Sequence, residues 1–322
     1  MFKNNFIKAI EIWRPVDGVQ VSAAYNKVGM FLELADSYYQ DADEFRDISS
    51  NHKVFFNEGL VGQAWAEGRP KLLHNLQSSD CIRGQAAVKA GFNCTLAIPL
   101  FAGESIASVV TLFCSDDESY VGSVELWHKP IGTNEISLDD GYFQTDSAFE
   151  AESRKVKFMR GFGIAGIVWG TQLPFIMNNL GRNKRFVRSG SAARTGLTRG
   201  MGIPCGRKTE DEAWVVTLLS SLDTPIADRF EYWVPQDDGL VFSNGVCAHD
   251  RELVEYYSSH AMPLGAGALA QVWQTGIPTL NTDLAAEPEV IATSVKSAGL
   301  SMQVVLPVYW GERVSAVAAW YL

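Results

Sequence analysis

The chain has 322 residues, of which 47% are hydrophobic, 20% charged and 11% aromatic. This composition excludes a disordered or fibrous protein and allows two domains or three small ones. The net charge of −10 argues against nucleic acid as a partner, because phosphate contacts need clustered lysine and arginine. No apolar run reaches the ~18–20 residues of a membrane helix, and the N-terminus lacks the features of a secretory signal. We therefore expect a soluble, cytoplasmic protein without a membrane partner.

The cysteines and histidines are scattered along the chain. The cysteines are five in number and form no CxxC pair, and the five histidines form neither HExxH nor HxxxH. An odd, dispersed set of cysteines argues against a disulfide scaffold and fits a reducing compartment. The sequence predicts no metal site.

The predicted elements of the first third run from strands to helices and back to strands. A strand ends at Trp13 and Pro15, an extra loop follows over 16–29, and an alternating strand covers 32–39. A short helix over 59–67 stops at the breakers Gly68 and Pro70.

A second helix over 81–90 closes on Gly91, and a hairpin of two apolar strands over 95–115 turns at Gly103 and Glu104. The corresponding hairpin tips later in the chain are the charged stretch 208–212 and the pair Gly311 and Glu312.

The same order of elements recurs twice more at a nearly constant spacing. Trp65, Trp169 and Trp273 are 104 residues apart, and so are the prolines that follow them, Pro70, Pro174 and Pro278. The match continues without gaps over most of each unit. The chain is therefore read as three copies of one domain, with predicted limits 1–116, 117–223 and 224–322.

The repeated unit resembles the GAF domain family. The resemblance rests on the glycine pair before the tryptophan, on the Asn75-Leu76 and Asn179-Leu180 pairs, and on a helix arginine at Arg83 and Arg188. It implies an α+β fold of three tandem GAF-like domains, each an antiparallel sheet flanked by short helices. The third copy departs from the pattern, with Ile291 in place of the arginine and Ala270 in place of the second glycine.

A glycine-rich segment at 161–166 matches GxGxxG and by itself indicates a dinucleotide-binding turn. The helix that follows breaks by Pro174, and no βαβ pattern surrounds it. We therefore interpret the segment as a helix-starting turn in which glycine avoids strain.

Candidate ligand-binding residues follow from the resemblance and from the repeat. They are the aromatic, polar and basic side chains Trp65, Asn75, Arg83, Cys94, Trp169, Asn179, Arg188 and Arg194. For both tryptophans, packing between helix and sheet is the favoured role, and an aromatic ligand wall is the alternative. For Cys94, a buried apolar role is favoured, and no Cys–His pair supports catalysis. The divergence among copies predicts a ligand in only one or two of them, most readily the first or second.

Glutamate stands two residues before a tryptophan in each copy, as Glu11, Glu125 and Glu231. Residues two apart in a strand share a face. We expect a structural ion pair or hydrogen bond there rather than a catalytic acid.

Charge is unevenly divided among the copies. Basic and acidic residues number 10 and 13 in the first, 13 and 13 in the second, and 4 and 11 in the third. The bases of the second copy concentrate in one segment, at Arg182, Lys184, Arg185, Arg188, Arg194 and Arg199. A solvated helix face is one interpretation; the alternatives are an anion site for a nucleotide or phosphate, or a docking face for an acidic partner such as the third copy.

The predicted function is a non-enzymatic, small-molecule sensor or regulatory protein in signal transduction that acts on a separate effector protein. The class of ligand stays open between a nucleotide and another small metabolite, and so does a homodimer. We find no catalytic motif in the sequence and expect no output domain within it. Two alternatives remain: a ligand-free interaction scaffold and a cysteine-based reductase of a small molecule.

Overall fold

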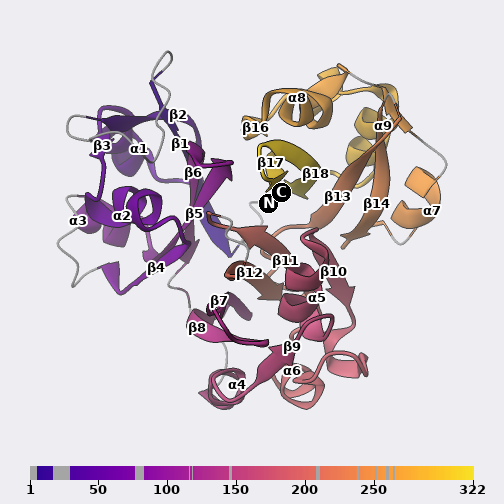
Figure 1. Ribbon diagram of the computed structural model, residues 1–322. Coiled ribbons are helices and arrows are strands. Elements are labelled where there is room, and N and C mark those ends of the chain that lie inside the picture. Colours follow the sequence, from indigo (N-terminus) through magenta and orange to yellow (C-terminus); the bar gives the residue numbers. More distant parts are fainter. Residues whose placement is uncertain are drawn as a thin grey trace.

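The computed structural model describes residues 6–16, 30–76, 83–115, 117, 119–144, 147–207, 211–237, 239–250, 252–258, 261–263 and 265–322. Within them, the chain forms three antiparallel sheets of six strands each, with short helices on their outer sides (Figure 1). The α+β class predicted for tandem GAF-like domains is confirmed. Most of the predicted extra loop and Cys81 lie outside the described residues.

Each sheet takes all its strands from within one of the three predicted units. The strands of the first unit are β1 (Ile7–Pro15), β2 (Phe31–Tyr39), β3 (Lys53–Phe55), β4 (Lys71–His74), β5 (Phe92–Ala102) and β6 (Ser105–Ser115). Those of the second are β7 (Gly122–Lys129), β8 (Glu135–Gln144), β9 (Lys157–Met159), β10 (Phe175–Asn178), β11 (Arg199–Cys205) and β12 (Ala213–Ser220). Those of the third are β13 (Arg229–Gln236), β14 (Gly239–Cys247), β15 (Ala261–Pro263), β16 (Thr279–Asn281), β17 (Gln303–Trp310) and β18 (Arg313–Tyr321).

Helices connect the strands at the same places in each unit. The first unit has α1 (Asp43–Ser50), α2 (Gly59–Glu67) and α3 (Gly84–Lys89), and the second has α4 (Ser147–Ser153), α5 (Gly163–Thr171), η2 (Leu180–Arg182) and α6 (Ser189–Thr195). The third has α7 (Leu253–Ser258), α8 (Gly267–Thr275), η3 (Leu284–Ala286) and α9 (Glu289–Ser297). The helices α1, α4 and α7 were not predicted. Each carries a buried apolar residue at the equivalent position, Phe45, Phe149 or Leu253.

The strand order is the same in all three sheets. The first sheet runs β3-β2-β1-β6-β5-β4, and the other two repeat this order with their own strands. In each sheet the first strand lies at the centre and pairs with the second and the last. The predicted hairpins between the last two strands turn at Gly103 and Gly311, both with positive φ. The threefold repeat in sequence is therefore a threefold repeat in topology.

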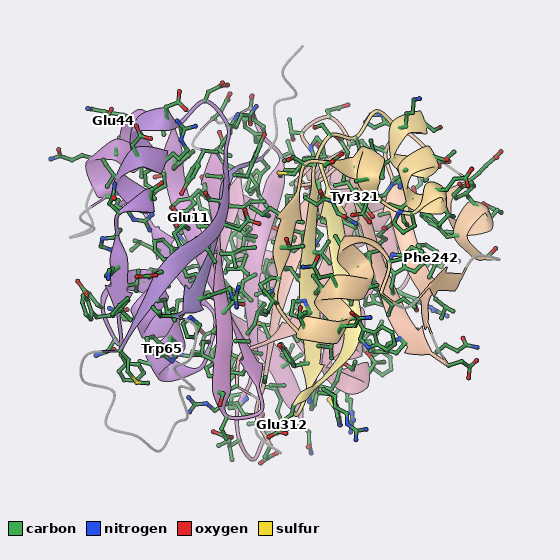
Figure 2. The ribbon with its side chains drawn as sticks, turned by 90° about the horizontal axis from the view of Figure 1, so that it is seen from above. Glu11, Glu44, Trp65, Phe242, Glu312 and Tyr321 are labelled. Carbon is green, nitrogen blue, oxygen red and sulfur yellow. The ribbon has the colours of Figure 1, made fainter. Side chains whose placement is uncertain are left out.

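The inner faces of the three sheets form one common core. Alternation along β1 places Ile10 and Ile12 in this core, while Glu11 and Trp13 face the helices. Side chains of all three units meet in it, among them Leu96 of β5, Met201 of β11 and Val304 of β17. These equivalent strands also contact one another, and Figure 2 shows strands at the centre with helices outside. The shared core buries the sheet faces that separate units would expose to water.

The contacts around this core are cyclic. Strand β4 of the first unit contacts β8 of the second, β10 of the second contacts β14 of the third, and β16 of the third contacts β2 of the first. Equivalent residues at the bulges of the second strands, Asp36, Asp140 and Asn244, each accept a hydrogen bond from the next backbone N–H. Asp36 and Asp140 also reach the neighbouring unit, through the backbone of Leu280 and the ring of His74. The units thus follow an approximate threefold axis.

The glycines that suggested a nucleotide turn serve local packing. A Cβ on Gly62 would lie 2.2 Å from the Phe55 carbonyl oxygen, and one on Gly166 would lie 2.3 Å from that of Met159. Gly161 has φ +86° and donates its N–H to the Gly166 carbonyl. These positions need glycine for close approach and positive φ, as the interpretation of a helix-starting turn predicts.

Among the helices of the described residues, none combines the length and the apolar character needed to cross a membrane.

Candidate functional site

A buried glutamate–arginine pair lies behind the helices of the first unit. Glu11 on β1 is fully buried and accepts hydrogen bonds from Trp13 Nε1 at 3.0 Å and Tyr39 Oη at 2.8 Å. Arg83 donates Nη1 to Glu11 at 2.6 Å and to Ser49 Oγ at 2.7 Å. The glutamate thus forms the structural ion pair and the tryptophan hydrogen bond that were expected.

The second unit repeats this pair with a tighter geometry. Arg188 binds both carboxylate oxygens of Glu125, at 2.5 Å and 3.0 Å, and also donates to Ser153. Trp127 Nε1 donates to Glu125 at 3.0 Å. A two-pronged guanidinium–carboxylate contact satisfies both buried charges.

The third unit keeps the glutamate, as Glu231, but its arginine lies on a strand instead of on the helix. Arg229 stands on β13 beside Glu231 and takes the place of the helix arginine, where Ile291 is now fully buried. Glu231 instead accepts hydrogen bonds from Tyr321 and from Trp233 Nε1. Burial raises the pKa of Glu231, although the guanidinium of Arg229 opposes the shift. The third unit thus carries its arginine two residues before the glutamate on the same strand, where it donates to Tyr257 and Ser294.

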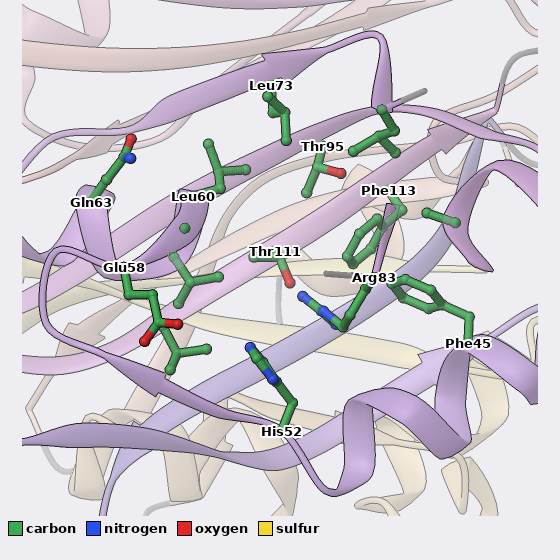
Figure 3. Close-up of a pocket in the computed structure, with 15 residues that line it drawn as sticks. Phe45, His52, Glu58, Leu60, Gln63, Leu73, Arg83, Thr95, Thr111 and Phe113 are labelled. Atoms are coloured by element: carbon green, nitrogen blue, oxygen red, sulfur yellow. The ribbon is translucent and has the colours of Figure 1, made fainter. Parts of the chain in front are cut away.

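The first unit contains a cavity of about 350 Å³ between its sheet and helices α1 to α3. Apolar walls come from α1, α2, β4 and β6, including Phe45, Leu60, Leu73 and Phe113 (Figure 3). This volume lies at the lower end of the ~300–1,000 Å³ typical of small-molecule pockets, and such pockets combine apolar walls with a few polar groups.

Polar groups converge inside this cavity. Figure 3 shows Arg83, Thr111 and His52 around one end of it. Thr95 is 4% exposed, and its hydroxyl has no hydrogen-bond partner among the described residues. Burial, reinforced by the charge of Arg83, lowers the pKa of His52, so its ring is neutral near pH 7. Glu58 is exposed at the opening of the cavity. The cavity therefore has hydrogen-bond donors inside and a carboxylate at its opening.

Larger side chains fill the other units at the positions equivalent to Val54 and Thr95. Phe158 stands at the position of Val54 and packs 5.0 Å from the Trp127 ring. Ile164 and Leu219 approach so closely to Gly200, the counterpart of Thr95, that a Cβ there would lie 2.3 Å from Leu219. In the third unit, Gln303 and Tyr321 occupy the corresponding strand positions, are fully buried and bond to each other at 2.8 Å. The third unit has a hollow of its own, of about 390 Å³, beside α8 and β16, and Gly267, Gln271 and Asn281 are among its lining residues. The three repeats therefore share a fold but differ in the shape and lining of their cavities.

Residues 16–126 match the family model of the GAF domain. This part of the chain is therefore similar to the GAF domain family. The match covers the first unit and ends within β7 of the second, so it includes the cavity. GAF domains commonly bind small-molecule ligands. No curated protein matches this chain in sequence.

Solved structures that resemble parts of the chain include GAF domains. One is the GAF domain region of a putative membrane protein from Geobacter sulfurreducens, with 16% identity over 34% of this chain and 64% of that one, at a TM-score of 0.26. Another is the nlh2 GAF domain of A. aeolicus in an inactive state, with 20% identity over 31% and 58%, at 0.24. A third is NreA of Staphylococcus aureus, mutated in its nitrate binding site, with 16% identity over 30% and 72%, at 0.24.

Of the residues predicted for ligand binding, Arg83 lines the cavity of the first unit. Trp65 is 1% exposed and packs edge-on against Phe56 at 5.0 Å, in the core role favoured for it. Asn75 and Asn179 are exposed and adopt positive φ, which explains the preference for asparagine at these turns.

The other predicted residues lie elsewhere and do not form one site. Cys94 faces the common core, fully buried, and burial raises the pKa of its thiol. Arg188 belongs to the filled second unit, Trp169 is half-buried on α5, and Arg194 is exposed on α6. The sequence did not single out His52, Thr95 or Thr111, because no motif contains them and only the cavity that they line brings them together.

The strand that bounds the cavity also forms the contact between the first two units. Leu73 on β4 lines the cavity, and the next residue, His74, points the other way to Asp140 of β8, with Nε2 and Oδ1 3.0 Å apart. Arg69 approaches Asp139 at 3.7 Å at the same boundary. The cavity wall and the unit boundary are therefore two faces of one short strand.

The His74–Asp140 pair makes the stability of the contact between the first two units depend on pH. The hydrogen bond to Asp140 raises the pKa of His74 above its unfolded value, so the pair stabilises the fold at pH below ~6.5 and this contribution is lost as pH rises through the folded-state pKa. We expect wild type to lose more stability than His74→Gln between about pH 6 and pH 8, as measured by urea denaturation. Equal pH dependence of the two proteins would contradict a charged His74–Asp140 pair.

Proposed function

We propose that the chain is a non-enzymatic sensor that binds a small molecule in the cavity of its first unit and regulates a separate effector protein. The observation that carries this proposal is the cavity itself, where Arg83 lies beside largely apolar walls and the buried hydroxyl of Thr95 has no partner among the described residues. A buried polar group without a partner costs free energy in the empty state, so a bound ligand with a matching group is favoured.

The ligand chemistry follows from the lining. Phenylalanine and leucine side chains favour an apolar or aromatic portion, and the guanidinium and hydroxyls favour hydrogen-bond acceptors. Because Arg83 is already paired with Glu11, the site does not demand a full negative charge. A compact metabolite or nucleobase-like molecule fits this description.

The geometry supports a ligand-free scaffold or a cysteine-based reductase less than it supports a sensor. A ligand-free scaffold leaves unexplained why the first unit keeps a cavity that contains buried polar groups. A cysteine-based reductase needs a reactive thiolate, but burial raises the pKa of the thiols of Cys94 and Cys205. The four cysteines of the described residues are free, and three of them are buried.

The second unit suggests a substitution that fills the cavity of the first. Val54→Phe places at this site the side chain that unit two carries at Phe158. We expect Val54→Phe to fold and to lose ligand binding, since its ring occupies the ligand's space. In the wild type, a ligand at about 100 times its dissociation constant adds ~2.7 kcal/mol of stability. Thermal denaturation with a panel of nucleotides and metabolites, and native mass spectrometry, measure the difference.

A matched control is Val254→Phe, the same change at an exposed position of α7, which should keep the ligand response. No thermal shift and no bound mass in the wild type would overturn the sensor proposal in favour of the scaffold. A response that survives in Val54→Phe would place the ligand outside this cavity.

A further inference from the structure

One surface segment of the second unit is basic without any acidic residue. Residues 180–199 contain six arginines and lysines and no aspartate or glutamate, in a chain whose net charge is −10. In the structure, two of these six side chains are buried and four are exposed to solvent. Arg188 and Arg199 are buried, with Arg199 donating to the Asp228 carbonyl of the third unit at 3.1 Å. The other four are exposed.

These four and one neighbour form what we call the basic patch. It consists of Arg182 on η2, Lys184 and Arg185 in the following loop, Arg194 on α6, and Lys155 just after α4. Of the supporting elements, α6 contacts both α4 and η2, and they lie at the outer end of the second unit, away from the other two units (Figure 1). Within the described part of the chain, none of the five forms an ion pair, whereas Arg154 beside them is paired with Glu150.

The loop that carries the patch is held in one conformation. Phe186 is 2% exposed and inserts into the core of the second unit, and Arg188 is tied to Glu125. Asn183 accepts a hydrogen bond from the backbone of Arg185 at 3.0 Å. These anchors leave Arg185 and Val187 facing outward, so binding does not require the loop to be ordered first.

The repeat shows that the fold does not require these charges. The aligned segment of the third unit, 284–297, has two acidic residues and one lysine, and that of the first, 76–90, has one acid and two bases. The same helix and loop are formed in the third unit without a basic surface. The charge is therefore specific to the second unit and points to a role in binding.

An exposed apolar side chain lies among the bases. Val187 is 59% exposed. It lies two residues after Arg185, which belongs to the basic patch. An apolar contact surrounded by charged groups is the usual arrangement of a protein interface. The chain as a whole carries a net charge of −10, which opposes the approach of long polyanions such as nucleic acid or an anionic membrane. A short acidic segment would contact only the bases.

We propose that the basic patch is the docking surface for an acidic segment of a partner protein, with an apolar side chain of that segment on Val187. The surface lies apart from the ligand cavity and its binding does not depend on a ligand. It deepens the proposed regulatory role by placing the effector on the second unit.

The test uses the full chain and two fluorescent peptides, an all-glutamate octapeptide and the same peptide with one central leucine. Fluorescence anisotropy should show that both bind and that the leucine peptide binds more tightly. Binding should fall steeply between about 50 mM and about 300 mM salt. The triple variant Arg182→Glu, Lys184→Glu and Arg185→Glu should lose affinity by at least about tenfold. Val187→Ser should remove only the preference for leucine.

A second triple variant controls for net charge. Lys89→Glu, Lys296→Glu and Arg313→Glu change exposed bases of the other units by the same total charge, and should leave peptide affinity within about twofold. Equal losses in both triple variants, or no peptide binding by wild type, would overturn the proposal. So would tighter binding to phosphatidylserine vesicles or to a nucleic acid duplex than to the peptides. None of these outcomes depends on Val54, so failure here leaves the sensor proposal standing.

Discussion

Replacing Arg188 with methionine is expected to lower the free energy of unfolding by about 3–5 kcal/mol, as removal of one partner of a buried ion pair does. The substitution leaves the fully buried Glu125 without its cation, and the hydrogen bonds from Trp127 and Thr217 do not neutralise its charge. Urea denaturation followed by tryptophan fluorescence measures the loss.

The double variant Arg188→Met with Glu125→Gln tests the cause. It removes both charges, so most of the lost stability should return. Arg154→Met is the matched control, because this exposed arginine pairs with Glu150 one helical turn away and should contribute less than about 0.5 kcal/mol. A loss of stability in Arg188→Met as small as that in Arg154→Met would show that the Arg188–Glu125 pair does not stabilise the fold.

Truncating Leu96 to alanine is expected to cost about 2–5 kcal/mol, the range for a fully buried leucine. Leu96 on β5 is inaccessible to solvent and lies where the three sheets meet. Because its neighbours belong to all three units, we also expect the chain to keep one unfolding transition that moves as a whole. Calorimetry and urea denaturation measure both properties.

Leu60→Ala provides the comparison. Leu60 is half-buried and already borders the cavity, so its truncation removes fewer contacts and should cost clearly less than the change at Leu96. Separate transitions for the three units in Leu96→Ala, or equal costs at the two sites, would contradict a shared core.

Parts of the site were accessible from sequence because they repeat. The glutamate before each tryptophan recurs three times, and alternation in a strand places both side chains on one face, where they bond at 3.0–3.2 Å. The helix arginines recur twice and proved to be the partners of these glutamates. The move of the third arginine to Arg229 was not predictable, because the two positions are distant in sequence and adjacent only in the folded unit.

The cavity could not be predicted from patterns in the sequence. A pocket is the space left after side chains from several elements have packed, and a difference such as Val54 against Phe158 alters it without altering any motif. Similarly, composition showed a basic segment in the second unit, but burial of Arg188 and Arg199 separated structural bases from those that face solvent.

The sequence by itself determined that the chain consists of three related α+β units, because periodicity and turn residues act locally and repeat in register. The tertiary structure alone decided how they assemble. The inner face of each sheet is apolar and is stabilised by removal from water, so the three faces pack into one core. The cavity proposed to bind a ligand lies on the helical side of the first unit, where small side chains such as Val54 leave it open.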